Sequence, residues 1–358
     1  MDSIKMIKDL TNAFGAPGFE RDVVDVAKKY ISDDFMTSQD NLHNLYIRPK
    51  KENKHKFTVM LDAHSDEVGL MVRYINSNGT IVFTTLGGWV PAVLPSSKLR
   101  IKARDGSVVI GVVASKPPHF GSWAKIEELP PAIDQMVIDV GCISKEEVED
   151  LGIGVGSPIV PCVDFEQIGD NMIAKAFDCR LGCAALIDTL EAVKNVDLGV
   201  NVVGALSAQE ENDIRGARVV ANVVRPDLAI IFEGSPADDT FAVPDAVQTA
   251  FRKGPMLRHM DEGMITHPGF LRLALDCAKA NGITVQEAVR LGGATNGSAY
   301  HLSNEGIPAI VIGYPVRFIH SHHGIASITD YKAGVALAMA ILKELNDENI
   351  TKLLGGNA

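Results

Sequence analysis

Short apolar runs alternate with helical repeats in two parts of the chain, and a segment without helical repeats separates them. Near the N-terminus, Ile4, Ile7 and Leu10 predict a helix over 3–13, and the run Phe57–Leu61 predicts a buried strand. From residue 165 the alternation returns, with strands predicted over 201–206, 228–232 and 308–313 and helices over 214–224, 271–281 and 331–345. Such alternation is typical of βα crossovers, so we predict an α/β fold with a mixed, mainly parallel sheet flanked by helices.

Residues 71–164 have a different pattern. Short strands are predicted over 68–75, 80–84, 99–103, 108–114 and 136–140. Asn78-Gly79 and Asp105-Gly106 supply tight turns between some of them, and no helical pattern occurs before 145–151. We therefore predict a small, mostly β domain at 71–164, inserted into an α/β domain that is built from 1–70 and 165–358.

The charge balance restricts the partners. The chain has 34 Lys plus Arg against 45 Asp plus Glu, which gives a formal net charge of −11. Because an acidic surface repels phosphate backbones, we expect no nucleic-acid partner. No apolar run approaches the ~18 residues of a membrane span, and the N-terminus lacks a signal-peptide pattern. Five cysteines, an odd number, argue against a disulfide framework, so we predict a cytoplasmic protein without a membrane partner.

Acidic and imidazole side chains follow or end several of the predicted elements. They are His64 and Asp66, Asp178, Glu210 and Glu211, Glu233, and His320. Each one alone has an ordinary explanation; Asp178, for example, is also suited to capping a helix over 181–192. Ligands of open α/β sheets bind at the carboxyl ends of the parallel strands. We therefore expect two histidines and three carboxylates of this set to converge at one edge of the sheet.

Mixed nitrogen and oxygen ligands suit zinc, cobalt or manganese. Five ligands exceed what a single catalytic zinc ion requires, and they fit a two-metal site with a shared carboxylate. Glu210 lies beside the ligand candidate Glu211 and is a candidate general base for the activation of water. The chain has no phosphate-binding loop, no His-Glu-x-x-His helix and no Gly-x-Ser-x-Gly elbow.

Sequence motifs that extend over most of the chain resemble those of one enzyme family. They are Leu61-Asp-Ala-His-Ser-Asp-Glu-Val-Gly69, Gly87-Gly-Trp-Val-Pro91, Ser115-Lys-Pro-Pro-His119, Lys175-Ala-Phe-Asp178, Ala208-Gln-Glu-Glu211 and Arg317-Phe-Ile-His-Ser321. In these motifs the chain resembles the dinuclear-metal aminopeptidases of metallopeptidase family 42, which include the glutamyl, deblocking and tetrahedral (TET) aminopeptidases. The resemblance implies a fold of the zinc-exopeptidase type, in which the insert is a β-barrel-like dimerisation domain.

The resemblance also implies which residues hold the metals. By position, His64, Asp178 and Glu233 would bind one ion. Asp178, Glu211 and His320 would bind the other, so that Asp178 bridges the two. Two divalent ions per subunit are implied, with zinc or cobalt as the expected metals and manganese as the alternative.

Two further roles follow from the same resemblance. Glu210 would be the general base, and Asp66 would orient His64. The implied activity is removal of N-terminal residues from short peptides. The implied partners are peptide substrates and copies of the same chain, with dimers assembling into a hollow dodecamer.

Four positions depart from the family pattern. Glu233, Cys179 and Asn296 stand where Asp is common in relatives, and His322-His323-Gly324 replaces the usual Pro-x-Glu. Beside the aminopeptidase, two alternatives therefore stay open. One is another metal-dependent amidohydrolase or carboxypeptidase on the same scaffold, and the other is a catalytically inactive oligomeric binding protein.

The sequence does not specify which N-terminal residue is removed. Four basic residues lie in segments that flank the expected site, and each is a candidate for binding an acidic side chain of the substrate: Arg252, Lys253, Arg258 and Arg317.

Overall fold

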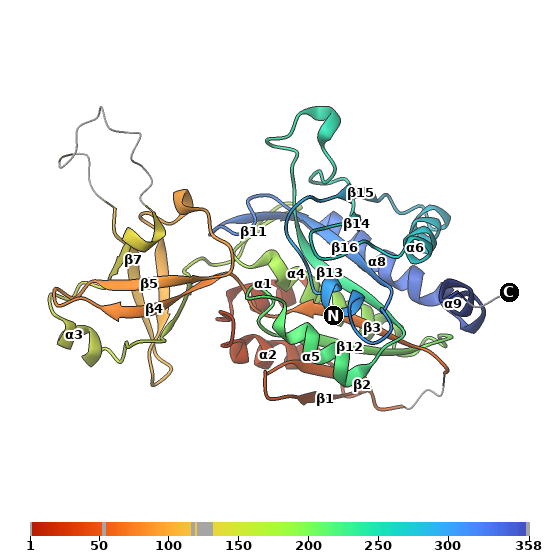
Figure 1. Cartoon of the computed structure of the whole chain (residues 1–358), viewed down its shortest axis with the longest axis horizontal. Coiled ribbons are helices and arrows are strands. Elements are labelled where there is room, and N and C mark those ends of the chain that lie inside the picture. Colours follow the sequence, from red (N-terminus) through yellow and green to blue (C-terminus); the bar gives the residue numbers. More distant parts are fainter. Residues whose placement is uncertain (1, 52–54, 116–118, 120–131, 356–358) are drawn as a thin grey trace.

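The computed structural model describes residues 2–51, 55–115, 119 and 132–355. Within them the chain forms a large sheet with helices on both faces, a closed barrel and a small third sheet (Figure 1). The predicted fold class, an α/β domain combined with a small β barrel, is confirmed. Of the motif at 115–119, residues 116–118 lie outside the described residues.

The large sheet has the strand order β1-β2-β12-β3-β13-β16-β14-β15. Its strands are β1 (Phe35–Gln39), β2 (Leu45–Pro49), β3 (Thr58–His64), β12 (Asn201–Ser207), β13 (Leu228–Pro236), β14 (Met256–Met260), β15 (Gln286–Val289) and β16 (Ala309–Val316). The central strands β12, β3, β13 and β16 pair in parallel, whereas β1, β2 and β14 join antiparallel neighbours. The carboxyl ends of the four central strands therefore lie at one edge of the sheet.

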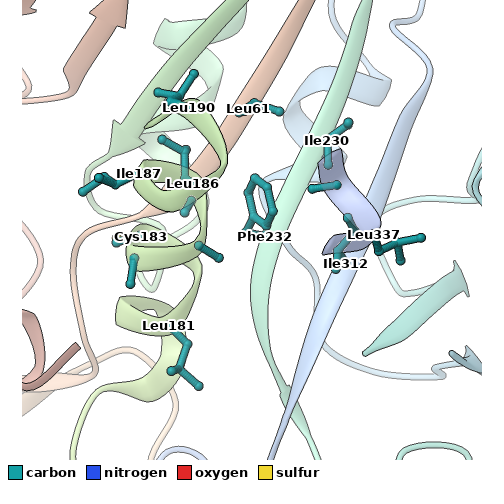
Figure 2. Packing of buried hydrophobic residues seen from close by; sticks show 14 of the residues in the cluster. Leu61, Leu181, Cys183, Leu186, Ile187, Leu190, Ile230, Phe232, Ile312 and Leu337 are labelled. Carbon is teal, nitrogen blue, oxygen red and sulfur yellow. The ribbon is translucent and has the colours of Figure 1, made fainter. Parts of the chain in front are cut away.

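Helices bury both faces of this sheet. On one face lie α1 (Ser3–Asn12), α2 (Arg21–Ala27), α4 (Phe177–Val193), α6 (Pro268–Ala280) and α8 (Ile328–Glu344), and on the other lie α5 (Arg215–Val224) and α7 (Gly297–His301). The alternation of side chains along β3 matches these two layers, because Val59 and Leu61 pack on the α4 side and Met60 packs on the α5 side. Figure 2 shows Leu186 of α4 beside Phe232 of β13.

The barrel has the strand order β4-β5-β8-β7-β6-β9. Its strands are β4 (Gly69–Ile75), β5 (Ile81–Leu86), β6 (Lys98–Lys102), β7 (Val108–Val113), β8 (Val137–Asp139) and β9 (Pro158–Pro161), with the short helix α3 (Lys145–Asp150) beside them. Inward-facing Leu70, Val72, Ile101 and Ile138 form its own core, separate from that of the large sheet. The division of the chain at 71 and 164 stays a prediction.

A small sheet connects the two parts. It consists of β10 (Glu166–Ile168), β11 (Asn171–Ala174) and β17 (Gly324–Ser327). The last helix is α9 (Asp347–Leu353). No helix among the described residues is long and apolar enough to cross a membrane.

Several strands extend further than predicted, and two of them carry residues of the candidate site. β3 continues past Leu61 to His64, because it still pairs with Ser207 of β12 at that point. β13 continues past Phe232 to Pro236 because it stays paired with β16. His64 is therefore the last residue of its strand, and Glu233 lies within its strand instead of after it.

Candidate metal centre and active site

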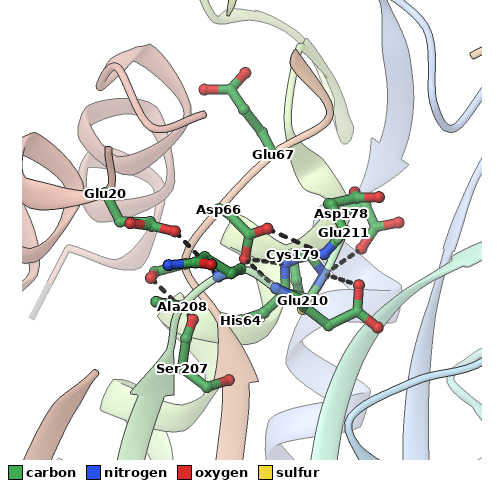
Figure 3. Close-up of polar contacts among 12 residues, drawn as sticks. Glu20, His64, Asp66, Glu67, Asp178, Cys179, Ser207, Ala208, Glu210 and Glu211 are labelled. Atoms are coloured by element: carbon green, nitrogen blue, oxygen red, sulfur yellow. Dashed lines mark hydrogen bonds and ion pairs between the residues drawn. The ribbon is translucent and has the colours of Figure 1, made fainter. Parts of the chain in front are cut away.

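The sheet edge gathers the predicted site residues from segments far apart in the sequence. Figure 3 shows part of this set: His64, Asp66, Asp178, Glu210 and Glu211. His64 ends β3, and Glu210 and Glu211 follow the neighbouring strand β12. Glu233 projects from β13, and Asp178 lies at the start of α4.

Asp178 does not act as a helix cap: Ala176 occupies the N-cap position, and the Asp178 carboxylate contacts two histidines instead.

One group of potential ligands surrounds His64. Its Nε2 atom lies 2.9 Å from Asp178 Oδ1 and 3.3 Å from Glu233 Oε1. Cys179 Sγ belongs to the same group of atoms, all within 4.8 Å of one another. The Cys179 thiol donates to the carbonyl oxygen of Phe232 at 3.0 Å, and burial raises its pKa well above the ordinary value. The thiol is thus protonated and already bonded, which makes it a poor metal ligand.

A second group shares Asp178. His320 Nε2 lies 3.2 Å from Asp178 Oδ2 and 3.6 Å from Glu211 Oε1. The other ring nitrogen of His320, Nδ1, lies 2.9 Å from the carbonyl oxygen of Gly88, which fixes the ring. Asp178 therefore directs one oxygen to His64 and the other to His320, as a bridging carboxylate would.

Asp66 positions the turn that carries Glu210 and Glu211. Its Oδ1 accepts the backbone N–H of Glu210 at 2.9 Å, and its Oδ2 accepts the backbone N–H of Glu211 at 3.0 Å. Oδ1 also lies 3.3 Å from His64 Nδ1. The Glu210 carboxylate extends toward His64, with Oε2 3.9 Å from His64 Nε2.

Buried carboxylate oxygens show that these residues fit divalent cations. Both oxygens of Glu233 and Oε1 of Glu211 are buried without a hydrogen-bond partner among the described residues. Burial, together with repulsion from Asp178, raises the pKa of Glu233 to about 7, and burial raises the pKa of Glu211 to about 8. An uncompensated buried charge is costly, and a bound cation removes that cost. A cavity of about 20 Å³ lies beside Asp178, Glu211 and His320, which exceeds the ~10–15 Å³ that one water requires.

The backbone next to the ligands adopts the left-handed conformation repeatedly. Ala176, Gln209, Phe318 and His320 have φ values of 58°, 55°, 60° and 56°. Each such residue without glycine's freedom costs of order ~1–3 kcal/mol and persists where the surrounding structure enforces it. Clustering of these residues around one set of side chains is typical of a functional site.

Sequence reasoning assigned no role to a buried ion cluster behind the site. Lys175 donates to both carboxylate oxygens of Glu67, and Arg180 Nη2 lies 3.2 Å from Glu67 Oε1. Glu20 is also buried, and its Oε1 accepts the backbone N–H of Gln209 at 3.0 Å. Glu67 and Lys175 stand inside the quoted motifs, so a search for charged residues between apolar neighbours would have flagged them.

Asn296 lies in a buried network with Asp62. Its amide Nδ2 donates to Asp62 Oδ1 and to Ser207 Oγ, each at 2.7 Å, and the Tyr300 hydroxyl donates to the other oxygen of Asp62. Burial raises the pKa of Asp62 to about 6. A donor amide therefore stabilises the Asp62 carboxylate, whereas a second carboxylate at position 296 would repel it.

Three of the four basic candidates are already paired within the chain. The ion pairs are Arg258–Asp261 at 2.9 Å, Arg317–Asp239 at 2.6 Å and, more loosely, Arg252–Asp170 at 3.7 Å. Because a close internal carboxylate neutralises the guanidinium groups of Arg258 and Arg317, these two are weak candidates for binding an acidic substrate side chain. Arg252 is half exposed and only loosely paired, so it is less strongly excluded.

Comparisons with known proteins identify relatives over almost the whole chain. The family model described as M42 glutamyl aminopeptidase matches residues 44–337. The glutamyl aminopeptidase of Lactococcus lactis subsp. cremoris is 31% identical over 356 residues, covering 99% of each chain. The structure of a TET aminopeptidase from a marine sediment archaeon of the Thaumarchaeota has a TM-score of 0.92 and 33% identity, covering 98% of this chain and 99% of that one.

A further similar structure is that of the Pyrococcus horikoshii TET1 peptidase, which is described as assembling into a tetrahedron or a large octahedral shell. It has a TM-score of 0.85 and 25% identity, covering 96% of this chain and all of that one. The resemblance that the sequence motifs indicated is thus confirmed over nearly the whole length. The chain belongs to the M42 glutamyl aminopeptidase family and is a peptide hydrolase of the aminopeptidase type.

Proposed function

We propose that this aminopeptidase removes N-terminal residues from short peptides, with two divalent metal ions and with Glu210 as the general base. The observation that supports this most is the position of Asp178, whose two oxygens face two separate groups of histidine and carboxylate ligands. A single carboxylate shared in this way is what a co-catalytic two-metal site requires.

The proposed ligands are His64, Asp178 and Glu233 for one ion, and Asp178, Glu211 and His320 for the other. Zinc or cobalt is expected, with manganese as the alternative, because the ligand set combines imidazole with carboxylate. When bound, such ions polarise the scissile carbonyl group and lower the pKa of water.

Glu210 would move the proton. Its carboxylate is largely but not fully buried and lies 3.9 Å from His64 Nε2, while Asp66 fixes its backbone N–H. In this position its carboxylate can accept a proton from the attacking water and return it to the amine of the leaving peptide. Asp66 also lies beside His64 Nδ1, so it would keep the proton on that nitrogen and leave Nε2 free to bind metal.

The assembly is proposed from the relatives. The TET1 peptidase of similar fold can assemble into a tetrahedron or a large octahedral shell. We propose that residues 71–164 of this chain form the dimer interface and that dimers build a dodecamer. We also propose a cytoplasmic location. Light scattering at micromolar concentration tests the assembly: a monomer as the sole species would refute it.

Hydrolysis of aminoacyl anilides after removal of metal by a chelator tests the function. We expect loss of activity, and recovery on addition of zinc, cobalt or manganese. Blocking the α-amine of a peptide should stop cleavage, whereas blocking its α-carboxylate should not abolish it. The opposite result would identify a carboxypeptidase, and metal binding without turnover on any peptide would identify the inactive binding protein.

A further inference from the structure

A second and larger pocket lies next to the metal centre, between the barrel and the loop that carries His320. Its volume is about 480 Å³. Lys98 and Cys162 line its barrel side, and Ser321, His322 and His323 line the opposite side. Ser321 also lines the small cavity beside Asp178, Glu211 and His320, so the two spaces are neighbours. We call this space the His322 pocket.

His322 is a buried polar group that lacks a partner. Its side chain is only 7% exposed, its ring packs against Trp89 with centroids 5.4 Å apart, and its Nε2 atom has no hydrogen-bond partner among the described residues. A buried nitrogen without a partner destabilises the fold relative to a bonded one. A ligand atom that accepts or donates a hydrogen bond in this pocket would therefore be favoured.

The charge of the pocket selects the kind of ligand. Lys98 supplies the positive charge of its lining, the rings of His322 and His323 add nitrogens that can form hydrogen bonds, and none of its described lining residues is Asp or Glu, although the chain as a whole carries −11. A lining of this kind repels the α-ammonium group of a peptide and attracts a carboxylate. Since an extended peptide advances ~3.3–3.6 Å per residue, a group one or two residues from the scissile bond can reach a pocket beside His320.

We infer that the His322 pocket binds a carboxylate group of the peptide substrate. This inference rests on the proposed aminopeptidase function. The carboxylate has two possible sources, the C-terminus of a very short peptide or an acidic side chain close to the scissile bond. In both cases the ammonium group of Lys98 and the ring of His322 are the recognising groups.

Matched peptide pairs test the inference with the metal-loaded enzyme. One pair is a dipeptide as the free acid and as its C-terminal amide, and the other pairs exchange Glu for Gln at the first or second residue of an amidated peptide. We expect kcat/KM to favour the carboxylate member of at least one pair by about tenfold, as for a charge-assisted hydrogen bond. The pair that responds identifies the source of the carboxylate.

Two variants locate the contact. Lys98→Met removes the charge from an exposed position, and His322→Phe keeps the ring shape while removing its nitrogens. In both variants, kcat/KM for the carboxylate member of the responding pair should come close to kcat/KM for its neutral partner. Lys145→Met, the same change on the barrel helix α3, is the matched control and should keep the wild-type ratio. Because His322→Phe also disturbs the neighbourhood of His320, Lys98→Met is the decisive variant.

The outcomes separate the two proposals. If no pair shows a preference, or if the preference survives Lys98→Met, the pocket does not bind a substrate carboxylate. If neither peptides nor anilides are hydrolysed, the proposed function fails instead. In that case calorimetric titration with the same peptide pairs still tests the pocket, and equal affinities for both members would overturn the inference.

Discussion

Glu67 receives the ammonium group of Lys175 on both of its carboxylate oxygens, at 2.5 and 2.7 Å, in a position where both side chains are only 1% exposed. Arg180 adds a second cation at 3.2 Å from the same carboxylate. Glu67 directly follows Asp66, and Lys175 lies three residues before Asp178. This ion cluster therefore joins the two segments that carry Asp178 and Asp66, the proposed bridging and orienting carboxylates.

Removing the charge of Glu67 should cost more stability than removing that of Lys175. Glu67→Gln leaves two buried cations without an anion, and breaking a buried ion pair in this way costs about 3–5 kcal/mol. Lys175→Met leaves the pair of Glu67 with Arg180 in place, so its cost should be smaller. Urea unfolding, monitored by circular dichroism, measures the free energy of unfolding of the two variants. A larger decrease for Lys175→Met than for Glu67→Gln would contradict this account of the cluster.

The sequence was sufficient to predict at which edge of the sheet the candidate site residues lie. The run Phe57–Leu61 predicted a buried strand, and polar residues directly after such a strand belong at the ligand-binding edge of an α/β sheet. That reasoning placed His64 at the correct edge. It needed no knowledge of strand order, because every parallel strand of the sheet ends on the same side.

Contacts between distant segments were beyond such reasoning. Glu67 and Lys175 are 108 residues apart, and Arg317 pairs with Asp239 across 78 residues. Spacing along the chain says nothing about such pairs, because they depend on the order of strands and on the path of loops. Arg252, Arg258 and Arg317 thus remained candidates for substrate binding until the fold showed their internal partners.

Metal content tests the role of Asp178. If its carboxylate serves both ions, Asp178→Ala should lose both, since each remaining set then has only two ligands. His64→Ala should weaken mainly the ion that it shares with Glu233. Elemental analysis of the purified variants measures the occupancy, and two retained equivalents in Asp178→Ala would refute the bridging role.

Glu210 and Glu211 should have separable roles. Glu210→Gln keeps the size of the side chain and one acceptor but cannot take a proton from water. It should retain near-normal metal content, and its kcat should be about 10²–10⁴-fold lower than that of the wild type, the usual effect of removing a general base. Glu211→Gln should instead lower metal occupancy, because Glu211 Oε1 faces His320 Nε2 and a neutral amide is a poor ligand.

Elemental analysis and steady-state kinetics on both variants give the comparison. The two roles would be reversed if Glu210→Gln stayed within about tenfold of wild type, well short of the loss expected for a general base, while Glu211→Gln kept its metals and was inactive. Asp66 holds both backbone N–H groups, so neither substitution should displace the turn itself.

Gly234 allows β13 to approach the start of α4, and the site depends on this approach. A Cβ atom at position 234 would lie 2.7 Å from Asp178 Cα and 2.9 Å from Asp178 Cβ, so Gly234→Ala forces Asp178, the proposed bridging residue, to move. Overpacking of this kind costs about 1–3 kcal/mol, and displacement of Asp178 should also weaken the binding of both ions. Gly292→Ala is the matched control, because no atom lies within 4 Å of the added carbon there. Chelator titration and thermal unfolding of the two variants give the result: similar metal affinity in both would show that the close contact at Gly234 does not position Asp178.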